Sequence, residues 1–240
     1  MSGMNGFEHY RAISFDCYGT LIDWETGIAA ELVPWADRHS VAAGRDDLLA
    51  AFGSIETGVE QEHPTMRYPE VLGVVLDRVA ARFGTSATAA ERESFGASVA
   101  RWPAFPDSAE ALARLHERCR LVILSNIDRA SFAASQKLLE TDFDLVITAE
   151  DVGSYKPDAA NFAALVESVG GLGISSNELL HVAESLYHDH EPARAIGLDS
   201  VWIHRRYDRA GHGATAPPAT SWVPERRYPS LIEFAEAFCS

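Results

Sequence analysis

Five short apolar segments, each bounded by turn residues, restrict most strongly how this 240-residue chain can fold. Several of them are continuously apolar, which is typical of strands buried on both faces of a parallel sheet. Helical patterns lie between them, so that strand and helix alternate along the chain. We therefore expect an α/β fold with a doubly wound parallel sheet. The segments are Ala12–Cys17, Arg120–Ser125, Phe143–Thr148, Leu179–Ala183 and Ser200–His204.

One long segment interrupts this alternation between the first and second predicted strands. From Trp24 to about Arg101 the chain has apolar residues at three- and four-residue spacing, which predicts helices. So many helical residues exceed what a single crossover connection needs. We expect a helical cap domain, residues 23–101, inserted into an α/β core domain made of residues 1–22 and 102–240. A short strand near Trp222–Val223 and a closing helix, Ser230–Phe238, should complete the core.

The composition narrows the possible partners. The chain has 20 Lys and Arg against 35 Asp and Glu, a formal net charge of −15. Such a chain repels phosphate backbones and anionic lipid surfaces, so we expect neither nucleic acid nor a membrane as a partner. No apolar run approaches the ~20 residues of a membrane span. The opening residues lack the apolar region of a secretory signal, which predicts a cytoplasmic protein.

Cysteine and histidine spacing gives no sign of a metal or cofactor. The three cysteines are widely separated and form no CxxC pair, which indicates a reducing compartment without a disulfide framework. His181, His188 and His190 cluster in the sequence but lack a matching thiolate or further ligand at a suitable spacing. We therefore expect no metal site and no cofactor.

Polar residues follow the predicted strands at the points where they end. Ligands of open parallel sheets bind beyond the carboxyl ends of the strands, so these residues should converge on one crevice. Each residue alone has an ordinary explanation as a turn residue, a helix cap or a solvated charge. These explanations do not account for the whole set in this order. The set comprises Asp16, Cys17, Tyr18, Gly19, Thr20, Ser125, Asn126, Lys156, Glu184, Ser185 and Asp189.

In order and spacing this set resembles the haloacid dehalogenase superfamily of hydrolases. The resemblance spans essentially the whole chain, and the predicted cap lies where that family carries its own. It implies that Asp16 attacks the substrate and forms a covalent ester, which water then hydrolyses. Family members are often dimers, so the resemblance also implies a possible homodimer. The matching motifs read FDCYGTLID, VILSN, YKPD and HVAESLYHDHEPA.

Elementary electrostatics assigns roles around that nucleophile. A nearby cation keeps a carboxylate ionised, and Lys156 suits this task and could also hold the substrate. Thr20, Ser125 and Asn126 supply hydroxyl and amide donors for an anionic substrate group. Backbone N–H groups of the Cys17–Gly19 turn can join them as an anion-binding nest. Asp189 is placed to position or activate the hydrolytic water.

The residue two positions after the nucleophile separates the branches of the superfamily. Phosphatase members carry an aspartate there, which protonates the leaving group, and they require magnesium. Tyr18 occupies that position here, and the pattern resembles the 2-haloacid dehalogenase branch, which displaces a C2 substituent of a small carboxylic acid without a metal. A magnesium-dependent phosphatase is one alternative. A binding protein without turnover is another, although the presence of both Asp16 and Lys156 argues against it.

The cap and the fourth motif depart from the dehalogenase pattern. Those enzymes hold the departing halide with an arginine of the first cap helix. Here Asp47 lies near that place, with Arg45 or Arg38 as possible substitutes, and Phe162 replaces a tyrosine. The fourth motif reads Ala-Glu-Ser in place of Ser-Ser-Asn, which introduces Glu184.

These departures favour an amine leaving group, because a protonated amine prefers an anionic surrounding. They resemble the relatives that open the strained ring of azetidine-2-carboxylate, with 2-haloacid dehalogenation as the alternative. Glu184 should contact either the substrate or Lys156. Trp24 and Tyr18 should form walls of the pocket or pack beside it, and the Cys17 side chain should point into the core. We thus expect hydrolytic displacement at C2 of a small carboxylate.

Overall fold

The computed structural model describes residues 6–209 and 211–240, and these contain one six-stranded sheet in which every pairing is parallel. Its strand order is β3-β2-β1-β4-β5-β6, which confirms the predicted doubly wound α/β fold. The strands are β1 (Ala12–Phe15), β2 (Arg120–Ser125), β3 (Leu145–Thr148), β4 (Leu179–Ala183), β5 (Ser200–Ile203) and β6 (Arg227–Tyr228).

The last strand is the one strand whose predicted place was wrong. It lies at Arg227–Tyr228 rather than near Trp222–Val223, because the β5 backbone pairs there: His204 N–H donates to the Tyr228 carbonyl at 2.8 Å. Trp222 instead stacks beneath the Arg194 guanidinium, 4.7 Å from the ring centroid. The apolar character of Trp222 thus serves a surface contact and not a strand.

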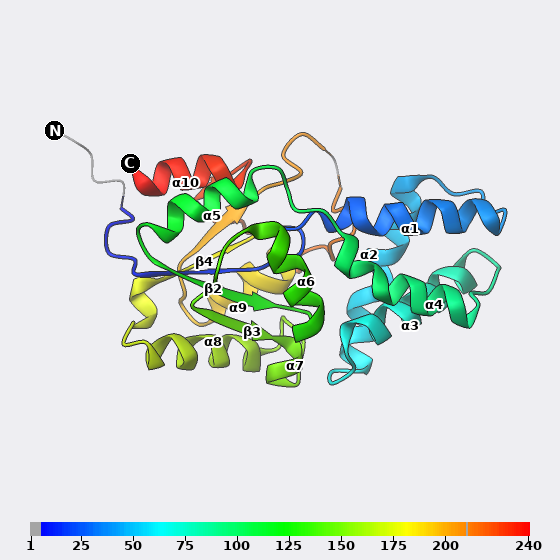
Figure 1. Ribbon diagram of the computed structural model, residues 1–240, viewed down its shortest axis with the longest axis horizontal. Helices are drawn as coiled ribbons and strands as arrows, with labels where there is room; N and C mark the ends of the chain where they lie inside the picture. Colours follow the sequence, from blue (N-terminus) through cyan, green and yellow to red (C-terminus); the bar gives the residue numbers. More distant parts are fainter. Residues whose placement is uncertain (1–5, 210) are drawn as a thin grey trace.

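Helices cover both faces of the sheet, as its continuously apolar strands require (Figure 1). Alternate strand residues face opposite layers: Ile13 and Phe15 belong to one apolar cluster, whereas Ala12 belongs to the other. In Figure 1, α5 and α10 lie along one side of the sheet and α8 along the other. The core helices are α5 (Ser108–His116), α6 (Arg129–Leu139), α7 (Ala149–Val152), α8 (Ala159–Gly171), α9 (Glu191–Ala195) and α10 (Leu231–Cys239), with short turns η2 (Ser176–Glu178) and η3 (Leu186–His190).

The inserted cap is entirely helical within the described residues and lies at one end of the molecule (Figure 1). The apolar spacing seen in the sequence becomes its interior, where Leu48 and Phe52 of α2 and Val75 of α3 are buried. That residues 23–101 form a separate domain stays a prediction. The cap elements are α1 (Trp24–Arg38), α2 (Arg45–Glu62), α3 (Tyr68–Arg82), α4 (Ala89–Gly96) and η1 (Ala97–Arg101).

The connections between cap and core are closely packed. Asp23 caps α1 by accepting a hydrogen bond from Thr26 N–H, and its own N–H donates to the Pro103 carbonyl at 2.8 Å. Gly27 leaves space for Trp102 on the returning segment, since a Cβ there would lie 2.2 Å from the indole ring. The outgoing and returning segments therefore run side by side, which fixes the cap above the carboxyl ends of the strands.

None of the helices in the described part of the chain combines the length and the apolar character that crossing a lipid bilayer requires.

Candidate active site

A buried ion network stands at the carboxyl ends of β1 and β4, where the sheet order reverses. Asp16 N–H donates to the Val182 carbonyl at 3.1 Å, so the β1–β4 ladder continues to the carboxylate. Lys156 Nζ lies 2.9 Å from Asp16 Oδ1 and 2.7 Å from Asp189 Oδ1. All three residues are at most 6% exposed. In this dry surrounding the two carboxylates and the ammonium hold one another in fixed positions.

The hydrogen bonds of Asp16 fit its ionised form. Glu184 N–H donates to Thr20 Oγ1, so the Thr20 hydroxyl hydrogen is directed to Asp16 Oδ2, at 2.7 Å. Both Asp16 oxygens thus accept a hydrogen bond. Burial and the charge of Asp189 raise the pKa of Asp16 above its ordinary value, and the Lys156 charge and the Thr20 hydroxyl act in the opposite direction. Thr20 therefore orients the carboxylate, and its expected role in orienting the substrate stays a prediction.

Lys156 is fully engaged, because an ammonium has three donors. The third donates to the Leu124 carbonyl at 3.0 Å. The two neighbouring carboxylates raise the pKa of Lys156 against its burial, so the side chain stays charged. Lys156 was also expected to hold the substrate, but all three of its N–H donors are already engaged. Asn126 fixes the backbone instead: Lys156 N–H donates to Asn126 Oδ1 at 2.6 Å and the amide donates back to the Lys156 carbonyl.

Asp189 lies within the π-helical turn η3, an irregularity that recurs at functional sites. Its Oδ1 accepts from Lys156 and lies 3.0 Å from His181 Nε2, whose Nδ1 is 2.9 Å from Ser14 Oγ. The Lys156 charge and the His181 hydrogen bond lower the pKa of Asp189 despite its burial. Asp189 is therefore an anion at neutral pH. In the sequence His181 was noted only as one of three clustered histidines, and its orienting role was missed.

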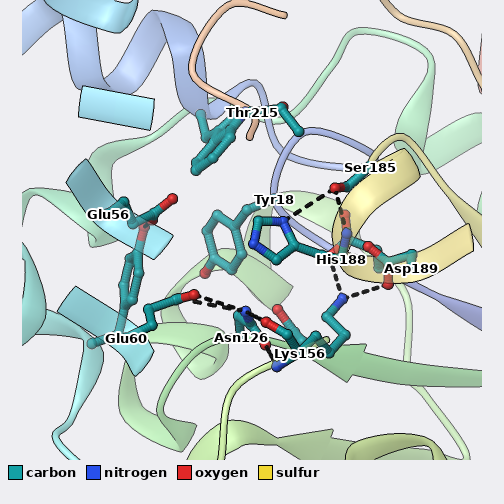
Figure 2. Close-up of a pocket in the computed structure, with 13 residues that line it drawn as sticks. Tyr18, Glu56, Glu60, Asn126, Lys156, Ser185, His188, Asp189 and Thr215 are labelled. Carbon is teal, nitrogen blue, oxygen red and sulfur yellow. Dashed lines mark hydrogen bonds and ion pairs between the residues drawn. The ribbon is translucent and has the colours of Figure 1, made fainter. Parts of the chain in front are cut away.

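These residues open into a small cavity between core and cap (Figure 2). The centre of a water molecule can occupy about 40 Å³ inside it, where a single water needs roughly 10–15 Å³. Ser125 Oγ, buried and lining the cavity, has no hydrogen-bond partner and remains available to a ligand. The core contributes Asp16, Tyr18, Ser125, Asn126, Lys156, Ser185, His188, Asp189 and Thr215, and the cap Trp24, Glu56, Glu60 and Tyr68.

The cap wall contains two carboxylates that sequence reasoning missed. Glu56 and Glu60 lie one turn apart on α2 and are 3% and 2% exposed. Burial raises the pKa of Glu56 to about 7 and that of Glu60 well above its ordinary value. A signal was present, because both glutamates fall on the helix face defined by Phe52 and Val59. Acidic residues on an otherwise apolar helix face indicate a binding or catalytic site.

Aromatic and hydroxyl groups complete the walls. The Tyr18 hydroxyl lies 2.7 Å from Ser135 Oγ, and the Trp24 ring packs edge-on against Phe52. His188, also missed, lies 3.1 Å from Ser185 Oγ through Nδ1 and 3.4 Å from Thr57 Oγ1 through Nε2. Desolvation lowers the pKa of His188 to about 4, so this bridge between core and cap is neutral.

Comparisons with known proteins agree with this geometry. A family model described as "Hydrolase: haloacid dehalogenase-like hydrolase" matches residues 10–197. The chain belongs to this family. It is a hydrolase. Haloacid dehalogenase-like hydrolase domain-containing protein 3 of Xenopus laevis is 29% identical over 131 residues, 52% of this chain but only 47% of that protein. (S)-2-haloacid dehalogenase of Pseudomonas sp. (strain YL) is 25% identical over 203 residues, 82% of this chain and 84% of that protein.

Solved structures show the same fold. L-2-haloacid dehalogenase from Xanthobacter autotrophicus superposes with a TM-score of 0.74 at 20% identity, covering 95% of this chain and 97% of that one. A defluorinating L-2-haloacid dehalogenase superposes with a TM-score of 0.76 at 21% identity, covering 96% of each chain. The predicted haloacid dehalogenase fold is thereby confirmed.

Several expected features of this hydrolase lie elsewhere in the structure. Glu184 faces a second, adjoining cavity, where it accepts a hydrogen bond from Thr215 at 3.1 Å, so it contacts neither the Asp16 cavity nor Lys156. Gly19 also lines that second cavity, and its N–H donates to the Ile22 carbonyl, which removes it from the expected anion nest. The Cys17 side chain is buried in the core, as expected.

The proposed substitutes for a halide-binding arginine are also distant from the Asp16 cavity. Arg38 pairs with Glu91 on the cap surface, and Arg45 lines the second cavity. Asp47 accepts a hydrogen bond from Gly44 N–H at the start of α2. Phe162 packs edge-on against His181 beneath the sheet. Among the described residues no arginine lines the Asp16 cavity, and the carboxylates of its cap wall are Glu56 and Glu60.

The donor set does not suit a divalent cation. The Lys156 ammonium already bridges the two carboxylates at the strand ends, and Tyr18 replaces the second aspartate. In the described ranges, 6–209 and 211–240, no group of three or more His, Cys, Asp or Glu residues is arranged to hold a metal.

Proposed function

We propose that this hydrolase displaces a substituent at C2 of a small carboxylic acid through an ester on Asp16. The observation that supports this best is the Asp16–Lys156–Asp189 network. It presents an oriented carboxylate nucleophile paired with a buried cation, and it faces a small cavity. The proposal also draws on the similarity to L-2-haloacid dehalogenase from Xanthobacter autotrophicus, one structure of which holds chloropropionic acid covalently bound.

The reaction proceeds in two displacements. An Asp16 oxygen attacks C2, the C2–O bond forms, and the C2–substituent bond breaks with its electron pair leaving on the substituent. A water molecule oriented by Asp189 then attacks the Asp16 carbonyl carbon and releases the 2-hydroxy acid. One water proton ends on the 2-hydroxyl oxygen as its bond to the Asp16 carbonyl carbon breaks, the other passes by way of the Asp189 carboxylate to solvent, and the Asp16 carboxylate is restored. Ser125 Oγ, the unpartnered hydroxyl in the cavity, is the expected donor to the substrate carboxylate.

The leaving group is a halide or the amine of a strained ring, as in azetidine-2-carboxylate. The cavity favours the amine. Among the described residues, Lys156 is the only Lys or Arg that lines it, its donors are all engaged, and the cap wall is acidic. A departing anion has no cationic partner there, whereas a protonated amine has two carboxylates.

Three substrates test the proposal: each enantiomer of 2-chloropropanoate, each enantiomer of azetidine-2-carboxylate, and an aryl phosphate with magnesium. We expect azetidine to be opened to the corresponding 2-hydroxy-4-amino acid, chloride release to be slower, and a chelator to have no effect. Inversion at C2 should restrict turnover to one enantiomer. Efficient hydrolysis of the phosphate that a chelator abolishes would refute the proposal, as would binding of the acids without turnover of any.

A further inference from the structure

The two walls of the cavity differ in how their charges are balanced. Figure 2 shows Glu56 and Glu60 on one side and Lys156 and Asp189 on the other. Lys156 directs its three donors to Asp16, Asp189 and the Leu124 carbonyl, and none to the cap. No other Lys or Arg lines this cavity among the described residues. The cap carboxylates therefore face the ligand space without a neutralising partner.

Only neutral donors contact these two carboxylates. The Tyr68 hydroxyl donates to Glu56 Oε1 at 2.5 Å, and the Asn126 amide lies 3.3 to 3.4 Å from the Glu60 oxygens. Two buried carboxylates without a cation favour uptake of a proton, and the raised pKa values of Glu56 and Glu60 agree. A cation brought by a ligand would fulfil the same electrostatic need as that proton.

The remaining surface of this half of the cavity suits a cation as well. Tyr18, Trp24 and Tyr68 all line it, and aromatic faces attract ammonium groups. Ser125 lines the same cavity, and its buried Oγ is without a hydrogen-bond partner. One ligand can therefore place an acceptor against Ser125 and a positively charged group against α2.

We propose that Glu56 and Glu60 bind a protonated nitrogen of the substrate, so that the natural substrate is a small zwitterion and not a plain halogenated acid. The site would take an ammonium at or beside C2, held between the two carboxylates and the aromatic walls. The inference rests on the proposed function for the reaction. The inference that the ligand carries a positive charge rests only on the residues of the cap wall.

A pair of ligands that differ in one group tests this charge directly. L-Proline and cyclopentanecarboxylate have the same ring size and the same carboxylate, and they differ by an NH₂⁺ in place of a CH₂. Neither carries a strained or halide leaving group, so calorimetry measures binding without turnover. We expect the wild-type protein to bind proline at least about tenfold more tightly, as for a hydrogen bond between charged groups.

Two isosteric variants locate the effect. Glu56→Gln and Glu60→Gln keep an oxygen to accept from Tyr68 and Asn126, and each should abolish most of the preference for proline. Glu62→Gln is the matched control on the same helix, because Glu62 is exposed and pairs with Arg78 at the surface. The control should retain the full preference. Thermal unfolding monitors the fold of all three variants.

The outcomes separate this inference from the proposed function. Equal binding of the two ligands by the wild type, absence of proline binding at millimolar concentration, or a full preference in both cavity variants would overturn the inference. Turnover of 2-chloropropanoate without any nitrogen preference would leave the proposed reaction standing and refute the zwitterion. A nitrogen preference lost in the Glu56 and Glu60 variants, without turnover of any C2-substituted acid, would support the cap site and refute the reaction.

Discussion

The core wall and the cap wall of this cavity each bury two carboxylates, but only the core wall supplies a cation that contacts them. On the core wall Asp16 and Asp189 share the Lys156 ammonium, which acts to lower the pKa of both: that of Asp189 is lowered, whereas burial and the Asp189 charge keep that of Asp16 raised. On the cap wall Glu56 and Glu60 have only neutral donors, and their pKa values are raised. Burial is equal, so the difference arises from the counter-ion. The shared cation holds the nucleophile in place, and the carboxylates without a contacting cation are left for a ligand.

The largest effect should follow from removing the nucleophile. Asp16→Asn preserves shape and the Thr20 and Lys156 contacts, yet an amide cannot form the ester, so turnover should fall by about 10⁴-fold or more. In the wild type, a single turnover in H₂¹⁸O should place the label in Asp16, measured by mass spectrometry of the peptide. Label that enters the product directly in a single turnover would contradict attack by Asp16.

Removal of the shared cation should be next in size. Lys156→Ala leaves Asp16 and Asp189 facing each other without a counter-ion, and loss of one electrostatic stabiliser from a dry site costs ~10²–10³ in rate. We expect at least this loss in kcat, together with a lower melting temperature. Lys137→Ala, an exposed lysine on α6, is the control. Activity within tenfold of wild type would show that the core wall does not depend on Lys156.

Asp189 should act on the second step alone. Asp189→Asn keeps the contact with Lys156 but weakens the orientation of water, and loss of such a group costs roughly 10²-fold. We expect the first displacement to proceed and the Asp16 ester to accumulate, visible as a mass increase of the protein in quenched reactions. A variant that slows turnover without any accumulated ester would place Asp189 in the first step instead.

Glu184, a buried carboxylate outside the cavity, should show the smallest effect on activity. Burial raises its pKa to about 8, so it carries its proton at neutral pH and Glu184→Gln should change kcat/KM less than twofold at pH 7. The unfolded state ionises near pH 4.5, whereas the folded state resists ionisation up to about pH 8. Wild-type stability should therefore fall relative to the variant as pH rises through that window, and differ by a constant amount above it. Melting curves from pH 4 to 9 measure this, and parallel curves would contradict it.

The residues of the core wall could be predicted from the sequence because the topology of a parallel sheet is regular. Asp16 follows β1, Ser125 ends β2, and Lys156 and Asp189 lie in the connections after β3 and β4. The carboxyl ends of parallel strands meet at one edge of a sheet. Their convergence needed only the alternation of strand and helix. The roles of these residues were harder to predict from the sequence. That Thr20 orients Asp16, and that Lys156 has no donor to spare, depends on hydrogen-bond geometry within about an ångström.

The residues of the cap wall could not be predicted from the sequence in the same way. Glu56 and Glu60 lie in the middle of a helix that no rule of strand topology directs to the active site, so their position depends on how α2 packs over the sheet. Glu184, which lies within the fourth motif, lines a neighbouring cavity, and nothing in the sequence separates the two cavities.

Local sequence determined the strands, the helical insertion and the charged residues at the strand ends, since periodicity and parallel pairing act over short distances. Tertiary structure alone decided which buried carboxylates have a counter-ion. That property depends on the separation of groups from different elements, because charges in a dry interior interact strongly with whatever lies within a few ångströms, irrespective of distance along the chain.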